Sequence, residues 1–407
     1  MEFNFNTMVK HVDHDKQLNT TELLRLALNR SRKRLHWLQE AATHRSPIDV
    51  EALTGYSGEG EYLAYLFIGT PPRPFPAIID TASDLTWTQC APCNNCSAQP
   101  TPLFNRTTST SYAALKCPNK KCKLYKSDGC DKRPPDAKCT YNRTYGDGRG
   151  TRGELATETL WFEGLRVPRV LFGCGFHSYG DVLSGGAGVL GLGRWNDSIV
   201  SQLGVGTFSY CLPTFGANGT GRLLMGSGAR VGAGAFTTPL LRHPGVRGGG
   251  LYYVRLQWIS INGAHINVNS SAFKDGSGGL VIDSGTAITQ LEKSTFEAVG
   301  KELTCQIGLQ PTDGDLELCY KLPRGHADAE GIQFPEIVLG FEGGPLELPS
   351  RNYFLTVKDK RMVCFMMAAT DSPLSIFGSF QQQDTLVAYD LANEELSFAP
   401  YTPCNHY

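Results

Sequence analysis

The 407-residue sequence has no long hydrophobic run. No stretch approaches the roughly 18 consecutive apolar residues of a membrane-spanning helix. The N-terminal stretch MEFNFNTMVKHVDHDK also lacks the apolar core of about 7–15 residues that a secretory signal peptide contains. We therefore expect no membrane span, and no signal peptide within the sequence as it stands.

An excess of charge of either sign is also absent. The chain carries 38 Lys and Arg against 39 Asp and Glu, a formal net charge of −1. This balance argues against nucleic acid as the main partner. Apolar residues make up 41% of the chain and charged residues 19%, which is typical of a globular protein, and the length allows two sizeable lobes.

Cysteine, by contrast, is abundant. The chain has 13 cysteines, and eight Asn-x-Ser/Thr sequons accompany them. Dense cysteine is the stronger of the two signs of an oxidising compartment. We interpret the chain as a secretory glycoprotein whose signal peptide is missing from this sequence. The expected location is extracellular (the apoplast), with the vacuole as the alternative.

The 45 glycines and 23 prolines favour short strands and tight turns over long helices. The clear exception is residues 19–42, where Asn19 and Glu22 make an N-cap signature. Spacings of four and three place a stripe of residues on one face of this helix: Leu24, Leu28, Ser31, Leu35 and Leu38. Five basic residues outnumber two acidic ones within it, so the helix is cationic.

After about residue 60 the sequence reads as strands separated by turns. EYLAYLFIG, PAIID, LYYVRLQWISING and TLVAYDLANEELSFA are examples. A cationic helix ahead of a β body indicates a propeptide, which we assign to residues 1–55; an ordinary surface helix is the alternative. His11 and His14 lie in this segment without a visible partner cluster, so we expect them to be solvated.

The β body looks internally duplicated. In the first half an apolar run leads into Asp80 within IIDTAS, and GVLGLG follows at 188–193. In the second half an apolar run leads into Asp283 within VIDSGT, and SIFGSF follows at 375–380. The seam is expected near the glycine-rich HPGVRGGG at 243–250.

Two aspartates in matching frames can do chemistry that neither does alone. Like charges about 3 Å apart share one proton, so the ionised partner can draw a proton from water while the protonated partner polarises a carbonyl. Hydroxyls of Thr81, Ser83, Ser284 and Thr286 are available to orient the carboxylates. The alternative is that Asp80 and Asp283 only cap turns.

These motifs, together with TYNRTYGDGRGTRGELATETL at 140–160, resemble a pepsin-type aspartic protease, and more closely its nepenthesin-like plant branch. The resemblance runs from about residue 58 to 407. It implies an all-β, bilobal fold with a substrate cleft between two β-rich lobes. The N-terminal lobe would span 56–245 and carry Asp80 and the flap, and the C-terminal lobe would span 246–407 and carry Asp283.

The resemblance assigns roles to individual residues. Asp80 and Asp283 match the catalytic dyad, and their frames supply its support: Thr81, Ala82, Ser83, Ser284, Gly285 and Thr286. Tyr145 and Gly146 match the flap, a hairpin that closes over bound peptide. Trp87 matches the tryptophan whose ring nitrogen is expected to hydrogen-bond that tyrosine, since a buried indole N–H needs a partner.

Position 82 departs from the family, because most members have glycine there. Alanine still supplies a backbone N–H to the Asp80 carboxylate. If the position requires a positive φ, the methyl group costs roughly 1–2 kcal/mol, which corresponds to a rate loss of about 5- to 30-fold. Alanine is therefore expected to weaken an enzyme without abolishing its chemistry.

The CAPCNNC stretch has the Cys-x₂-Cys spacing of a metal site, but no second such pair completes it, so disulfides are favoured over zinc. The family pattern implies six bridges: Cys90–Cys93, Cys96–Cys174, Cys117–Cys139, Cys122–Cys130, Cys211–Cys404 and Cys319–Cys364. Cys305 is left as a buried free thiol. We expect no metal and no cofactor.

The resemblance implies an aspartic endopeptidase, active in acid on peptide or protein substrates, and a monomer. The alternative is a catalytically inactive relative that acts as a binding or inhibitor protein. The basic helix at 19–42 suggests a zymogen, held at neutral pH by cleft carboxylates and processed in acid between about Ala41 and Gly60.

Overall fold

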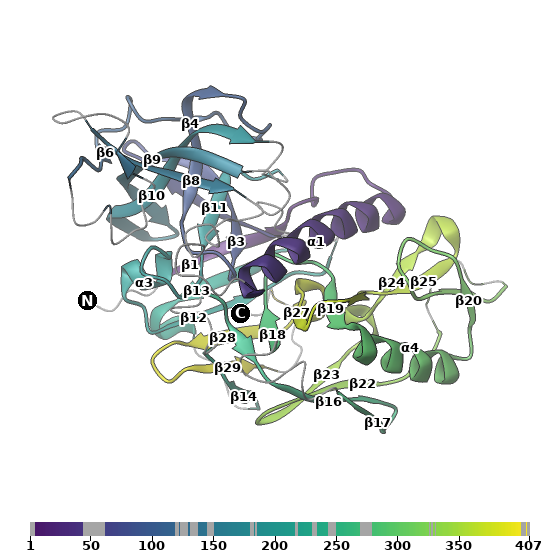
Figure 1. The fold of residues 1–407 in the computed structure, drawn as a ribbon. Coiled ribbons are helices and arrows are strands. Elements are labelled where there is room, and N and C mark those ends of the chain that lie inside the picture. The colour runs from purple at the N-terminus through teal and green to yellow at the C-terminus, as the bar shows by residue number, and fades with distance from the viewer. Residues whose placement is uncertain are drawn as a thin grey trace.

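The computed structural model in Figure 1 has two β-rich lobes and one long helix that lies against both of them. It describes residues 5–43, 62–118, 122, 129–130, 137–144, 150–179, 183, 185–215, 219–229, 234–242, 250–268, 279–324, 326, 329, 331–399 and 404. In this part of the chain the α-helices are α1 (Thr20–Thr43), α3 (Ile199–Leu203) and α4 (Lys293–Ile307). All other regular structure is strands and short 3₁₀ turns, which confirms the predicted all-β class.

One large sheet runs through the first lobe and the base of the molecule. Its strand order is β14-β29-β28-β12-β13-β1-β2-β3-β11-β4-β10-β9-β8-β7, with β5 paired to β4 and β6 paired to β9. The strands are β1 (Phe5–His11), β2 (Tyr62–Ile68), β3 (Arg73–Asp80), β4 (Trp87–Asn94), β5 (Phe104–Asn105), β6 (Ala113–Ala114), β7 (Gly129–Cys130), β8 (Cys139–Thr144), β9 (Gly150–Phe162), β10 (Leu165–Tyr179), β11 (Gly188–Gly191), β12 (Thr207–Cys211), β13 (Gly221–Met225), β14 (Phe236–Pro239), β28 (Leu386–Asp390) and β29 (Glu395–Phe398).

The second lobe is built from three smaller sheets, of order β15-β18-β27-β19-β26, β17-β16-β22-β23 and β20-β21-β25-β24. Their strands are β15 (Tyr253–Val254), β16 (Leu256–Ile261), β17 (Ala264–Asn267), β18 (Gly279–Ile282), β19 (Thr289–Glu292), β20 (Gln310–Thr312), β21 (Cys319–Lys321), β22 (Ile337–Phe341), β23 (Gly344–Leu348), β24 (Phe354–Val357), β25 (Met362–Phe365), β26 (Met367–Thr370) and β27 (Leu374–Phe377).

The same strand arrangement occurs once in each lobe. β3 ends at Asp80 and pairs in parallel with β11, so that Gly191 lies beside Asp80. β18 ends one residue before Asp283 and pairs in parallel with β27. The two apolar–apolar–Gly motifs of the sequence therefore form the strands that flank the two aspartate strands.

The strand-like stretches of the sequence all form strands, and two of them form more than one. TLVAYDLANEELSFA folds as the hairpin β28–β29, and LYYVRLQWISING contains both β15 and β16. β28 pairs with β12, so the C-terminal end of the chain returns to the large sheet. In Figure 1 these strands lie at the base, between the two lobes.

The N-terminal segment contains a strand that the sequence reading missed. β1 inserts between β13 and β2 as an antiparallel strand, with alternate residues buried. His11, at its end, is fully buried against Tyr62 and Phe215, and His14 is partly buried. The expectation that both histidines are solvated is wrong, because period-two burial along β1 carries His11 into the protein.

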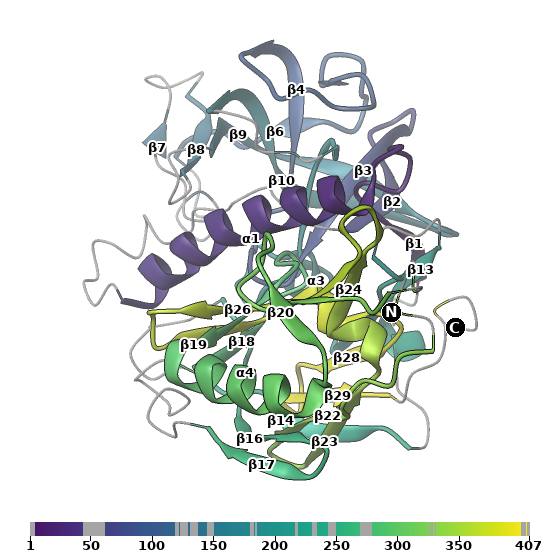
Figure 2. The same cartoon turned by 90° about the vertical axis from the view of Figure 1, so that its right-hand side faces the viewer.

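Helix α1 begins and ends within one residue of the predicted bounds. Asn19 and Glu22 form the expected reciprocal cap, each side chain accepting from the other's backbone N–H at 2.9 Å. Figure 2, turned by 90°, shows α1 running between the two lobes. Among the described helices, this one included, none is long and apolar enough to cross a membrane.

Six disulfides are present, but all four bridges expected among the cysteines from Cys90 to Cys174 are wrong. The bridges are Cys90–Cys174, Cys93–Cys96, Cys117–Cys130 and Cys122–Cys139, with Cys211–Cys404 and Cys319–Cys364 as expected. β4 and β10 are neighbouring strands, which brings the Cα atoms of Cys90 and Cys174 to 5.5 Å, a proximity that spacing within CAPCNNC does not reveal. Cys305 is the free thiol among the described residues, and it is exposed rather than buried.

The disulfides also account for the close cysteine cluster. Cys117, Cys122 and Cys139 have sulfur atoms within 4.8 Å of one another, a spacing that a metal could use. All three are in two neighbouring disulfides, so none offers a thiolate. Cys90, Cys93 and Cys96 are likewise divided between two bridges.

Candidate active site

The loops that follow β3 and β18 are joined by hydrogen bonds between their hydroxyl residues. The backbone N–H of Thr81 donates to Ser284 Oγ at 3.2 Å, and the backbone N–H of Ser284 donates to Thr81 Oγ1 at 3.0 Å. Ser284 Oγ in turn donates to the carbonyl of Ile79 at 3.1 Å. These reciprocal bonds bring Asp80 and Asp283, 203 residues apart in sequence, to one place between the lobes.

Asp283 is surrounded by donors from its own loop. The backbone N–H of Gly285 donates to its Oδ1 at 2.8 Å, and Thr286 Oγ1 donates to its Oδ2 at 2.6 Å. The side chain is fully buried. Hydrogen bonds to a buried carboxylate favour its ionised form, so this loop is built to hold a negative charge.

Asp80 is equally buried but has fewer donors. The backbone N–H of Ala82 donates to its Oδ1 at 2.9 Å, while its Oδ2 has no hydrogen-bond partner among the described residues. Burial raises the pKa of Asp80 to about 6; the guanidinium of Arg34 lowers it, and the neighbouring Asp283 raises it further. Asp80 therefore takes up a proton at a higher pH than an exposed aspartate does.

A third charged side chain lies between the two carboxylates. Arg34, from α1, donates through Nη2 to Asp80 Oδ1 at 2.5 Å and to Asp283 Oδ1 at 2.9 Å. Its Nε donates to Asp283 Oδ2 at 2.5 Å. All three side chains have no exposed surface, so α1 seals the aspartate pair from solvent.

The stripe on α1 explains how Arg34 reaches this point. Leu24 and Leu28 are buried against the second lobe, and Ser31 Oγ accepts the backbone N–H of Ile288 at 3.0 Å. Each buried leucine contributes roughly 1.5–3 kcal/mol to the docking of the helix. Leu35 packs on a small apolar cluster that includes Ala82. The side chain of Leu38 is not among those that the structure describes.

Further ion pairs hold the ends of the segment. Arg30 Nη2 meets the buried carboxylate of Asp13 at 2.9 Å, which ties α1 to the turn that follows β1. Closer to the helix start, Arg25 Nε lies 3.1 Å from Asp315 and Thr21 donates to Asp359 at 2.5 Å. The cationic helix thus docks on acidic groups of the β body, as its charge led us to expect.

Position 82 does not need glycine. Ala82 is absent from the residues with positive φ, its backbone N–H reaches Asp80, and its methyl group packs with Tyr253 and Val281. Gly285, the equivalent residue of the second frame, differs. A Cβ there would lie 2.7 Å from the Arg34 Cζ, so the guanidinium occupies the space that a side chain would fill.

The flap residues of the sequence reading, Tyr145 and Gly146, lie outside the described residues, so the expected Trp87–Tyr145 hydrogen bond is not tested. Trp87 itself is 1% exposed and packs with Tyr141 and Val189. Its Nε1 is buried and has no partner among the described residues.

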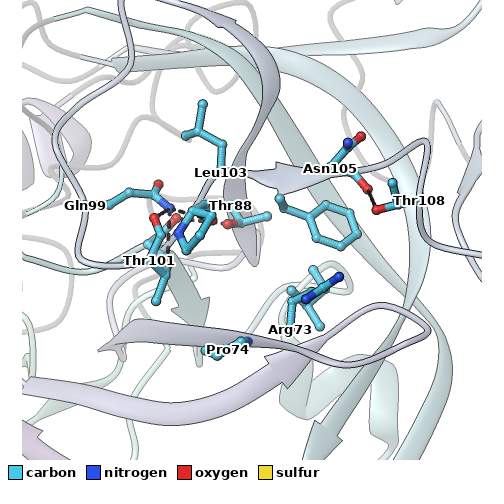
Figure 3. A pocket seen from close by; sticks show the side chains of 12 residues that line it. Arg73, Pro74, Thr88, Gln99, Thr101, Leu103, Asn105 and Thr108 are labelled. Carbon is cyan, nitrogen blue, oxygen red and sulfur yellow. Dashed lines mark hydrogen bonds between the residues drawn. The ribbon is translucent and has the colours of Figure 1, made fainter.

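A separate cavity of about 450 Å³ lies in the first lobe, between the β2–β3 turn and residues 99–108. Figure 3 shows Arg73 and Pro74 on one side of it and Gln99, Thr101 and Leu103 on the other. Neither aspartate lines it. The cavity is therefore not part of the site around Asp80 and Asp283.

Comparison with known proteins identifies the family. Two domain models, described as xylanase inhibitor N-terminal and xylanase inhibitor C-terminal, match residues 62–227 and 251–400. The aspartic proteinase nepenthesin-1 of Nepenthes gracilis is 40% identical over 403 residues, covering 97% of this chain and 89% of the relative. The chain belongs to the nepenthesin-like branch of the pepsin-type aspartic proteases.

Other relatives agree with this nepenthesin-like assignment, and solved structures share the fold. Nepenthesin-2 of the same plant is 39% identical over 403 residues, and aspartyl protease family protein 2 of Arabidopsis thaliana is 37% identical over 84% of this chain and 71% of the relative. The crystal structure of edgp superposes with a TM-score of 0.69 at 20% identity, covering 85% of this chain and 92% of that one. The structure of basic 7S globulin from soybean gives 0.67 at 20% identity, covering 84% and 94%; both likenesses concern the fold alone.

Proposed function

We propose that this chain is an aspartic endopeptidase, in which Asp80 and Asp283 activate a water molecule for attack on a peptide bond. The observation that carries the proposal is the geometry of the pair. Two buried carboxylates stand at equivalent ends of a duplicated strand arrangement, joined by a reciprocal hydroxyl grip, and one guanidinium nitrogen reaches both. Relatives named as aspartic proteinases support the reaction class.

The unequal environments of the two carboxylates suit them to hold one shared proton. The ionised carboxylate accepts a proton from water while the protonated one donates a hydrogen bond to the scissile carbonyl, and the roles reverse as the amine leaves. Acid favours this singly protonated state over the doubly ionised one. Cleavage is therefore expected in acid, on peptide or protein substrates, and without a metal or cofactor.

Residues 1–55 are proposed to be the prosegment of a latent precursor, with lobes at 56–245 and 246–407. The family models begin at residue 62, so β1 and α1 lie outside the matched region. Within that segment Arg34 occupies the dyad, where a substrate carbonyl and the attacking water would otherwise bind. Removal of the segment between about Ala41 and Gly60 would expose the pair.

The charges make this contact sensitive to acid. Arg34 favours the ionised form of Asp80, whereas burial favours the protonated form. As the pH falls through about 6, Asp80 takes up a proton and its attraction to Arg34 is lost. Below that value this ion pair adds nothing to the docking of α1.

The ion pair near the start of α1 responds at a lower pH than the contact between Arg34 and Asp80. Partial burial raises the pKa of Asp315, but hydrogen bonds from Lys360 and Arg25 outweigh this effect and leave the pKa below its ordinary value. The ion pair that this carboxylate makes with Arg25 thus survives mild acid. The contact at the dyad weakens first and the start of α1 is released last.

A second candidate function is a non-catalytic binding protein. The family models that match this chain are named for xylanase inhibitors, so membership alone does not establish catalysis. Such a protein has no need for a buried carboxylate pair or for an arginine that covers it. The aspartate pair, with Arg34 bound to both of its carboxylates, therefore favours the protease over the binding protein.

The test uses the full-length chain brought to acid and then assayed on a denatured protein substrate, with and without pepstatin. Cleavage that pepstatin blocks supports the proposal. Tight pepstatin binding without cleavage would indicate a missing flap or substrate subsite. Neither cleavage nor pepstatin binding, after removal of the segment by an added protease, would favour the binding protein.

The six disulfides among the described residues support an oxidising, secretory setting, in which the sequons are the proposed glycan acceptors. We place the enzyme outside the cell, with the vacuole as the alternative.

A further inference from the structure

The cavity of about 450 Å³ in the first lobe takes no part in the proposed reaction, and its lining indicates a ligand of its own. Its volume falls in the range of about 300–1,000 Å³ that is typical of small-molecule sites. The deep wall is apolar, since Ile68, Phe104 and Ala187 are each at most 5% exposed. Pro74 and Leu103 continue this apolar wall towards the mouth. A molecule that fills the cavity therefore needs an apolar body.

The walls of the cavity are held in place by the protein itself. β5, which carries Phe104, pairs in parallel with β4. The side chain of Gln89 on β4 accepts the backbone N–H of Ser97 at 2.7 Å and donates to the Ser97 carbonyl at 2.9 Å. Gln89 Nε2 also donates to Gln99 Oε1 at 2.6 Å, and Gln99 Nε2 donates to the carbonyl of Thr101 at 2.8 Å. These bonds fix the segment that forms one wall, so the cavity is preformed.

Most polar side chains that line the cavity already have partners. The Thr88 hydroxyl donates to a backbone carbonyl at 2.9 Å, and the Thr108 hydroxyl donates to the carbonyl of Asn105 at 3.0 Å. The oxygen and the nitrogen of the Gln99 amide are both used. Asn105 Oδ1 accepts the backbone N–H and the hydroxyl of Thr107, at 3.1 and 2.8 Å. These groups have little capacity left for a ligand.

Arg73 and Thr101 are the exceptions. Arg73 is exposed on β3, and its guanidinium has neither an ion pair nor a hydrogen bond with the part of the chain that the structure describes. Thr101, across the cavity from Arg73 in Figure 3, accepts from Gln99 Nε2 at 3.3 Å and keeps its own hydroxyl proton. Among the described residues that line the cavity, no side chain is acidic. The unpaired groups are therefore donors, and one of them is a full positive charge.

This lining matches a carboxylate better than other kinds of head group. The planar guanidinium of an arginine can donate two parallel hydrogen bonds to one carboxylate. An amine would place a second positive charge beside Arg73, with no acidic side chain of the lining to offset it. A wholly apolar molecule would remove water from the guanidinium without replacing its hydrogen bonds, which costs free energy.

We propose that this cavity binds a small carboxylate with an apolar body, whose carboxylate pairs with Arg73 and whose body packs between Phe104 and Leu103. A free acid and the C-terminal carboxylate of a peptide share this chemistry. The site lies apart from the aspartate pair, so the inference goes beyond the proposed protease function and does not depend on it.

The experiment measures binding of 3-phenylpropionate to the full-length chain at pH 7, where a simple carboxylic acid is ionised. Every protein carries Thr107→Ala, which removes the Asn105 sequon at the mouth, so that no glycan covers the cavity. Isothermal titration calorimetry should give a dissociation constant of about 0.1–1 mM, which a ligand of this size can reach. The neutral 3-phenylpropionamide and the short acid acetate should each bind at least about tenfold more weakly.

Variants of the protein locate the binding. Arg73→Gln should weaken the binding of 3-phenylpropionate by about tenfold, because hydrogen bonds to a charged group are lost. Arg73→Lys should lose less, since the charge remains while the planar pair of donors does not. Arg166→Gln is the matched control, as Arg166 is an exposed arginine on β10 of the same lobe that does not line the cavity, and it should bind as the parent does.

A peptide acid separates the two sources of the carboxylate. Tighter binding of N-acetyl-glycyl-phenylalanine than of 3-phenylpropionate would assign the site to peptide ends, and weaker binding would assign it to free acids. The proposal is wrong if the amide binds as tightly as the acid, or if Arg73→Gln binds as Arg166→Gln does. It is also wrong if 3-phenylpropionate neither produces a binding isotherm nor raises the melting temperature. Unfolding of each variant without ligand verifies that it is folded.

Discussion

The Asp80 and Asp283 frames have the same strand arrangement but hold their carboxylates differently. Asp283 accepts from Gly285, from Thr286 and from two nitrogens of Arg34. Asp80 accepts from Ala82 and from one nitrogen of Arg34, and one of its oxygens has no partner in the part of the chain that the structure describes. One positive charge thus stands between two negative ones, and the pKa of the less supported carboxylate, Asp80, is raised.

The two duplicated frames therefore have different roles: one holds Arg34 and the other responds to pH. The Asp283 frame holds Arg34, because Gly285 leaves a space for the guanidinium that any larger side chain at position 285 would fill. The first frame senses pH, because the pKa of Asp80 lies near 6. Alanine at position 82 is compatible with the role of the first frame, since it supplies a backbone N–H to Asp80 and its methyl group packs in an apolar cluster.

The largest expected effect is that of removing either carboxylate. Asp80→Asn and Asp283→Asn should each lower kcat of the processed enzyme by at least about a thousandfold, since both members of a general acid–base pair are needed. The unequal frames should make no difference to this result. Substrate cleavage and thermal unfolding measure it together, and a folded variant that retains a tenth of the wild-type rate would refute the dyad.

Arg34→Ala should open the precursor at neutral pH. It leaves two buried carboxylates facing each other without a counter-charge, a situation that costs about 3–5 kcal/mol, and this energy favours release of α1. We expect processing at pH 7 to accelerate about 100-fold or more, followed as the appearance of the mature N-terminus. Arg25→Ala is the matched control on the same helix: its guanidinium is 61% exposed, so the effect should stay within about threefold.

Exchange of the two small residues sharpens the comparison between the frames. Gly285→Ala places a methyl group against Arg34 without changing any charge, and overpacking of this kind costs about 1–3 kcal/mol. Processing at pH 6 should therefore accelerate by about tenfold. Ala82→Gly, the reciprocal change, should alter it by no more than about twofold. Equal effects of the two substitutions would contradict the assignment of Arg34 to the second frame.

The pH dependence should depend on Asp80. Susceptibility of α1 to an added protease should rise in wild type as the pH falls from neutrality to about 6, because protonation of Asp80 removes the charge with which Arg34 pairs. In Asp80→Asn the charge is absent at every pH, so susceptibility should be high and nearly constant over the same range. A steep pH dependence in this variant would place the sensor on another group.

The smallest effect concerns Cys305. Because it is the exposed free thiol of the described residues, one equivalent of thiol reagent should react with the native protein at an unhindered rate and leave unfolding unchanged. Peptide mapping without reduction should recover Cys93 linked to Cys96, and Cys90 linked to Cys174. Recovery of a Cys90–Cys93 peptide would contradict the bridges described here.

Much of the fold was predictable from local pattern. The duplicated aspartate frames, the flanking Gly motifs and the capped helix are all encoded within short stretches, where residue type and spacing determine structure. The two disulfides of the second half follow from the family resemblance, which orders its cysteines correctly there. In CAPCNNC, three nearby cysteines compete for distant partners, and only the pairing of β4 with β10 decides among them.

The sequence could not reveal which arginine reaches the dyad. Five basic residues lie within α1, and the choice of Arg34 depends on the docking of Leu24, Leu28 and Ser31 on the second lobe.

The central claim is that α1 holds an aspartic protease latent through Arg34. The most direct test measures peptide cleavage by the purified full-length chain at pH 7 and again after a shift to about pH 4, with the N-terminus determined at each time point. The account predicts no cleavage at pH 7, then a lag, loss of residues up to a point between about Ala41 and Gly60, and activity that rises with that loss. Full activity at pH 7 with the segment intact, or full activity in acid without its removal or displacement, would contradict it.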